Sequence, residues 1–147
     1  MSNIFKHLSS LSICTILTTG RTGSDFLQSI MDSHEQILTF NGQFQFHLFW
    51  RTSICVKSGD FLLSDFIDEF IGKHIEKFKS KYDLIEGKDR LGINLDQSIN
   101  INTSNFKDEF LSLMKNKSVN SKNCLLCIYG AYAKVLNQDI MLKKIFI

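Results

Sequence analysis

The chain has no proline among its 147 residues and only one tryptophan. It also lacks an unbroken apolar run of the length that crosses a membrane, so no membrane span is predicted. Its net charge is +2, without the strong basic excess that favours bulk nucleic-acid binding. The missing proline accompanies abundant lysine, asparagine, isoleucine and phenylalanine. We interpret it as a compositional bias without functional meaning.

Cysteine is also scarce, with Cys14, Cys55, Cys124 and Cys127 as its four occurrences. The last two form a CxxC pair, but two leucines separate them and no second ligand pair has metal spacing. Buried free thiols in a reducing compartment explain this pattern better than a zinc or redox site. We therefore expect no metal and a cytoplasmic location.

What the chain does contain is enough apolar material for a core. Hydrophobic residues make up 44% of the sequence, including thirteen phenylalanines, which excludes a disordered chain. The length predicts one domain over residues 1–147. Residues 1–19 faintly imitate a signal peptide, but the apolar run carries several hydroxyl residues and leads directly into a loop. We interpret its end, residues 13–17, as a strand.

The most informative segment follows that strand. Residues 20–23 form a short loop bracketed by Gly20 and Gly23, and a helix is predicted to open at Ser24 or Asp25. Unpaired amides and the dipole at the start of a helix attract anions, and Arg21 would add a forked cation suited to phosphate or sulfate. The apolar positions of that helix are Phe26, Leu27, Ile30 and Met31.

The loop differs from two common nucleotide-binding motifs. Only two residues separate Gly20 from Gly23, and no lysine follows the second glycine, so GxxxxGK[ST] is absent. No GxGxxG is present either. A kinase or a nucleotide hydrolase is therefore the less favoured interpretation.

The segment resembles a different loop. Gly20-Arg21-Thr22-Gly23-Ser24, followed by Asp32-Ser33-His34-Glu35, is similar to the 5′-phosphosulfate loop and helix-ending turn of sulfotransferases that use 3′-phosphoadenosine 5′-phosphosulfate (PAPS). The resemblance covers residues 13–40. It implies an α/β fold with a P-loop-like parallel sheet flanked by helices. It also implies PAPS as the sulfate donor and a hydroxyl or amine as the acceptor.

The resemblance also implies site residues, in a loop spanning residues 18–26. Arg21 would be catalytic, lying against the sulfonate oxygens, while Ser24 would donate to the 5′-phosphate. Two positions depart from the family pattern: Asp25 replaces a small or hydroxyl residue, and Glu35 replaces a proline. We expect Asp25 to point outward and cap the helix. The donor-binding residues implied are Gly20, Arg21, Thr22, Gly23, Ser24 and Asp25.

The general base is less clearly marked. Some relatives use a glutamate about twenty residues after the loop arginine, but residues 41–43 are Asn-Gly-Gln and contain no carboxylate. His47 is the nearest histidine and the candidate base, although a lone histidine among aromatic residues is more often packed in a core. The same consideration applies to Phe44, Phe46 and Trp50, which could line an acceptor pocket or belong to the core.

The family's 3′-phosphate elements are missing. They usually follow an R-D-P motif, which this sequence lacks, and we assign no role to Lys88-Asp89-Arg90. We therefore expect the amino-terminal part of a sulfotransferase, inactive by itself, with further nucleotide contacts beyond Ile147. The alternative is a non-catalytic fragment that retains only an anion-binding loop.

Periodicity predicts the remaining elements. We expect strands at 36–40 and 143–147. Residues 43–48 alternate as in a strand but fit a helix nearly as well, and this segment is left open. One helix is predicted over 62–78 with a cap at Ser64 or Asp65, another is capped by Ser104, and a third runs over 121–136. Residues 79–103 are polar and predict a long excursion.

Overall fold

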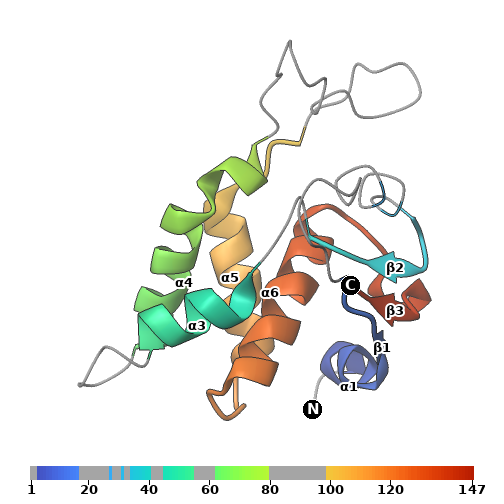
Figure 1. Cartoon of the computed structure of the whole chain (residues 1–147), viewed down its shortest axis with the longest axis horizontal. Coiled ribbons are helices and arrows are strands. Elements are labelled where there is room, and N and C mark those ends of the chain that lie inside the picture. Colours follow the sequence, from blue (N-terminus) through green and yellow to red (C-terminus); the bar gives the residue numbers. More distant parts are fainter. Residues whose placement is uncertain are drawn as a thin grey trace.

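The computed structural model describes residues 3–16, 27, 31, 34–40, 45–54, 62–79 and 99–147. Helix α6 lies between a small sheet and a layer formed by α3, α4 and α5 (Figure 1). The helices are α1 (Asn3–Ser10), α3 (Phe46–Ile54), α4 (Leu63–Lys73), α5 (Thr103–Met114) and α6 (Ser121–Val135), with 3₁₀ turns η1 (Ile75–Phe78) and η2 (Ile140–Leu142). The strands are β1 (Ser12–Ile13), β2 (Ile37–Leu38) and β3 (Ile145–Phe146).

The three described strands are all parallel, which confirms the predicted α/β class. Their order is β1-β3-β2, so the last strand lies between the first two. Phe146 is aligned with Ile13 on one side and with Leu38 on the other. In the two common doubly wound arrangements the first two strands are neighbours. The described strands follow neither of them.

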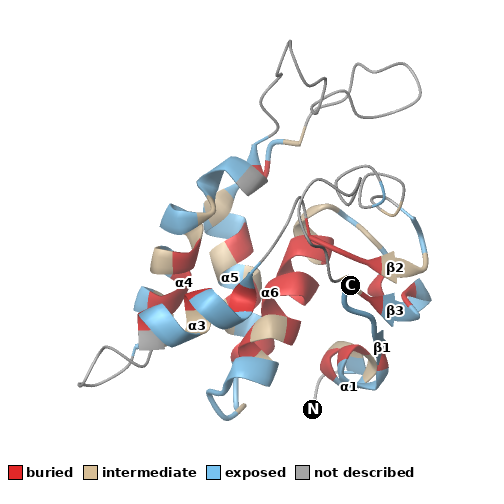
Figure 2. Ribbon diagram, in the orientation of Figure 1, coloured by how far each residue is buried: buried red, intermediate tan, exposed pale blue. Residues whose placement is uncertain are grey.

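Helix α6 is the centre of the core, because it is apolar around most of its circumference. Figure 2 shows most of it in the buried colour, whereas α3 and α4 alternate between buried and exposed residues. At Gly130 a Cβ would lie 2.7 Å from Leu8 Cδ1 and 3.1 Å from Leu113 Cδ1. Glycine at this position therefore lets α1 and α5 approach α6 closely.

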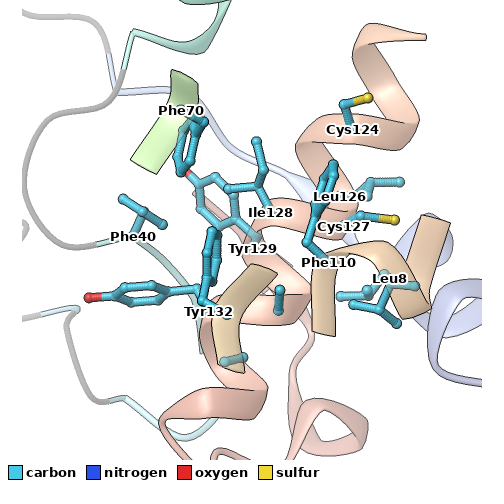
Figure 3. Packing of buried hydrophobic residues seen from close by; sticks show 14 of the residues in the cluster. Leu8, Phe40, Phe70, Phe110, Cys124, Leu126, Cys127, Ile128, Tyr129 and Tyr132 are labelled. Carbon is cyan, nitrogen blue, oxygen red and sulfur yellow. The ribbon is translucent and has the colours of Figure 1, made fainter. Parts of the chain in front are cut away.

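Aromatic rings connect the sheet to α6. Phe40, just after β2, lies with its ring centroid 4.3 Å from that of Tyr132 and 5.6 Å from that of Tyr129 (Figure 3). Tyr129 in turn lies 4.3 Å from Phe146 of β3. These contacts hold the central strand against the helix that precedes it.

The amino-terminal segment differs from the prediction. Residues 3–10 form α1, and β1 covers only residues 12–13, whereas the strand was expected over 13–17. The physical reason is that Phe5 and Leu8, three residues apart, are both buried on one face of a helix. The hydroxyl residues of this helix, Ser9 and Ser10, lie on its exposed side.

Several helix boundaries also differ. The single helix expected over 62–78 is divided into α4 and η1, and its cap is Leu62, which makes no side-chain capping bond. Asn102 caps α5 in place of Ser104, since its side chain accepts from the amides of Ser104 and Asn105. The third helix runs over Ser121–Val135, close to the prediction, and Asn120 caps it.

Two shorter segments are also settled. Residues 46–54 form α3, so the segment left open between strand and helix ends in a helix. The strands predicted at 36–40 and 143–147 are present as β2 and β3, each two residues long.

Candidate functional site

The predicted donor loop lies outside the described residues. Gly20, Arg21, Thr22, Gly23, Ser24 and Asp25 all belong to this segment. The structure does describe the frame on both sides of it. Residues 12–16 include β1 and its continuation, and Leu27 and Met31 are helical.

The described residues that precede the loop lie at the carboxyl edge of the sheet. The Cys14 amide donates to the Phe146 carbonyl at 2.8 Å, which extends the ladder one residue past β1. On the other side the Ile147 amide donates to the Leu38 carbonyl at 2.9 Å. In open α/β sheets, ligands bind beyond the carboxyl ends of the strands. Residues 17–26 come next after this part of the chain. The sheet edge at which β1 ends is the one where a ligand site is expected.

A hydrogen-bonded turn lies between Met31 and Ile37. The His34 amide donates to the Met31 carbonyl at 3.2 Å, and the Ile37 amide donates to the His34 carbonyl at 3.1 Å. The His34 ring contributes as well, since its Nδ1 accepts from the Gln36 amide at 3.1 Å. His34 therefore stabilises the turn that leads into β2.

His47, the candidate base, lies in the first turn of α3 with its side chain exposed. Its neighbours Phe46 and Phe49 are buried, so the helix directs the aromatic residues inward and the imidazole outward. The structure does not place His47 relative to the loop arginine, because Arg21 lies outside the described residues. The role of His47 as a base stays a prediction.

The aromatic residues near His47 belong to the core. The ring of Phe46 lies 5.9 Å from that of Trp50, which lies 5.7 Å from that of Phe66 on α4. Trp50 therefore packs α3 against α4, and Phe46 packs on Trp50, as the core alternative predicted. Phe44 lies outside the described residues.

No family model, curated protein or solved structure matches this chain. Every helix in the described part of the chain is too short or too polar to span a bilayer. Within that same part, no three metal-ligating side chains come together. The residues on both sides of the loop are therefore interpreted from their hydrogen bonds and their place in the sheet.

The CxxC pair is buried in α6. Burial raises the pKa of both Cys124 and Cys127 to about 12. Because the thiolate is the nucleophile and the metal ligand, such thiols are unreactive at neutral pH. This agrees with the free-thiol interpretation of these two residues, and both are free in the structure.

Thiol labelling checks this assignment. At pH 8 we expect iodoacetamide to modify the exposed Cys14 quickly and to reach Cys124 and Cys127 only after unfolding. Folding raises both pKa values from 9.0, so the unfolded chain loses these two protons at a lower pH than the folded chain does. The free energy of unfolding therefore falls as pH rises from about 9 to 12. Mass spectrometry of labelled peptides measures the rates. Equal rates at Cys14 and Cys124 would contradict the assignment.

Sequence reasoning missed two polar features. The first is a groove of about 450 Å³ where α5 begins and α6 ends. Three of its polar side chains make contacts within the fold: Glu109 and Lys134 form an ion pair, and Asn102 caps α5. The groove is lined by Asn100, Ile101, Asn102, Asn105, Asp108, Glu109, Lys134, Val135 and Asn137.

The second feature is a buried lysine, Lys143, whose ammonium binds the turn at His34. The sequence shows it only as one of two adjacent lysines before the last strand. No local pattern distinguishes Lys143 from Lys144, so the burial of Lys143 could not be predicted without the fold.

Proposed function

We propose that this chain is the donor-binding part of a PAPS-dependent sulfotransferase. The observation that carries the proposal is the Gly20–Ser24 motif, with its fixed spacing to Asp32-Ser33-His34-Glu35. The parallel sheet supports it, since the motif starts six positions after Cys14, whose amide extends the β1 ladder at the carboxyl edge. No comparison contributes to it.

The chemistry asked of the loop is charge stabilisation. The amides of residues 22–25 and the Ser24 hydroxyl would bind the 5′-phosphate, and Arg21 would stabilise negative charge on the bridging and sulfonate oxygens. The bond between sulfur and the bridging oxygen breaks as sulfur bonds to the acceptor oxygen or nitrogen. The acceptor proton passes to a base, for which His47 is the candidate, and adenosine 3′,5′-bisphosphate leaves.

An amide-resolved titration tests donor binding. Adding adenosine 3′,5′-bisphosphate to the ¹⁵N-labelled chain is expected to shift the Gly20 and Gly23 amide signals with saturation. Adenosine, which has no phosphate, is the control and is expected to leave them unchanged. If the bisphosphate at millimolar concentration leaves both glycine signals in place, the proposal fails.

A second candidate function is a non-catalytic anion-binding module. It is favoured by the lack of a carboxylate at residues 41–43 and of an R-D-P motif. The coding sequence distinguishes the two. A frame that continues past Ile147 into such a motif favours the enzyme, whereas a stop codon there favours the module.

A further inference from the structure

Lysines gather at one end of the molecule, where a loop joins α5 to α6. Lys115, Lys117 and Lys122 belong to this connection, and the whole span from Phe110 to Gln138 contains no aspartate or glutamate. Lys115 and Lys122 are exposed, and Figure 2 shows most of the loop in the exposed colour. The loop therefore presents positive charge that no acidic residue of the same span neutralises.

Helix α1 brings a fourth lysine to this end. The Nζ atom of Lys117 lies 4.4 Å from the centroid of the Phe5 ring, so the loop contacts α1. Lys6, the residue after Phe5, is exposed. The ion pairs found among the described residues involve none of these four lysines. We name Lys6, Lys115, Lys117 and Lys122 together the basic end.

Side-chain hydrogen bonds fix the shape of the loop. Asn123 Nδ2 donates to the Ser118 carbonyl at 2.8 Å, and Asn120 Nδ2 donates to the Ser118 hydroxyl at 3.1 Å. The Asn123 amide donates in turn to Asn120 Oδ1 at 2.9 Å. Because these bonds already order the loop, less conformational entropy is lost when a partner binds it.

One apolar side chain of the loop is also exposed. Val119 lies between Lys117 and Lys122 in the sequence and is 47% exposed. An aliphatic group among lysines suits the boundary between lipid headgroups and acyl chains. Residues 115–123 contain no arginine and no aromatic residue, the types that hydrogen-bond and stack on nucleic-acid bases. The composition of the loop therefore favours a lipid surface over a nucleic acid.

We propose that the basic end binds the surface of an anionic membrane. The four lysines lie against the negatively charged headgroups, and Val119 enters the headgroup region. The complementarity of charge supports this partner, since each lysine at an anionic bilayer surface strengthens binding by about fivefold. The contact uses no residue of the proposed donor loop, so it is independent of the proposed function.

Cosedimentation of the chain with lipid vesicles tests the proposal. We expect binding to vesicles of phosphatidylcholine and phosphatidylserine, no binding to phosphatidylcholine alone, and a steep loss of binding as salt is added. Lys115→Gln combined with Lys122→Gln should weaken binding to the anionic vesicles about 25-fold, or fivefold for each charge. The matched control combines Lys79→Gln with Lys144→Gln, which removes two exposed charges elsewhere and should retain the native affinity.

Val119→Ser tests the apolar part of the contact. We expect it to weaken binding to the anionic vesicles by about threefold or more, because less apolar surface leaves water. Native affinity in this variant would overturn the choice of a lipid surface. Circular dichroism at the assay temperature checks that each variant is folded, which is expected because every substituted side chain is exposed.

Three other results would overturn the proposal. The first is a native chain that does not bind the anionic vesicles. The second is an equal loss of affinity in the two double variants, which would show a response to net charge instead of to the basic end. The third is binding to an RNA oligonucleotide in place of the vesicles.

Discussion

Replacing Arg21 by alanine is expected to reduce sulfuryl transfer by about a thousandfold or more, by analogy with the cations that stabilise phosphoryl transfer. The guanidinium would neutralise charge that grows on the bridging oxygen as the bond to sulfur breaks. Its stabilisation is therefore larger in the transition state than in the bound substrate. Arg21→Lys should recover only part of the rate, since lysine keeps the charge without the planar fork.

The rate is measured with the full-length protein, as adenosine 3′,5′-bisphosphate released from PAPS with a mixture of hydroxyl and amine acceptors. Arg51→Ala is the matched control, because Arg51 is exposed near the end of α3. We expect it to retain the native rate. Turnover by Arg21→Ala within a few-fold of that control would refute the assigned role.

Replacing Phe70 by alanine is expected to lower the free energy of unfolding by about 3–5 kcal/mol. The Phe70 side chain is fully buried, at 0% exposure. Its ring centroid lies 5.4 Å from that of Phe49, 5.9 Å from that of Phe40 and 6.1 Å from that of Phe106. The substitution therefore removes ring contacts to α3, α5 and the end of β2 together, and leaves a cavity.

Urea denaturation of the two chains measures this difference. Leu48→Ala on α3 is the control, because Leu48 is 49% exposed and its truncation should change the free energy by less than about 0.5 kcal/mol. A loss at Phe70 no larger than at Leu48 would show that this aromatic cluster does not stabilise the fold.

Sequence periodicity located α4 and α5 because each buries a stripe that recurs every three or four residues. Phe106 and Phe110 on α5 lie on one such stripe, and both are fully buried. Short elements carry less signal. β1 and β2 have two residues each, too few for an alternating pattern, and α1 was missed because Phe5 and Leu8 lie within hydroxyl-rich sequence.

The candidate site also has one part that the sequence predicts and another that it does not. A loop of glycines and an arginine can be identified from sequence, since its chemistry resides in consecutive residues. His47 could not be classified, because whether a histidine is exposed or packed depends on which side of its helix meets a partner. The structure places it on the exposed side.

The sequence by itself determined the α/β class and the approximate positions of the long helices, because both follow from patterns among near neighbours. The anion loop is a prediction from the sequence alone. Only the tertiary structure decided that β3 lies between β1 and β2, and that Lys143 is buried while Lys144 is exposed. Neither lysine lies within β3, so alternation along that strand does not tell which of the two is covered. That depends on His34, 109 positions earlier in the chain, and on His7, 136 positions earlier.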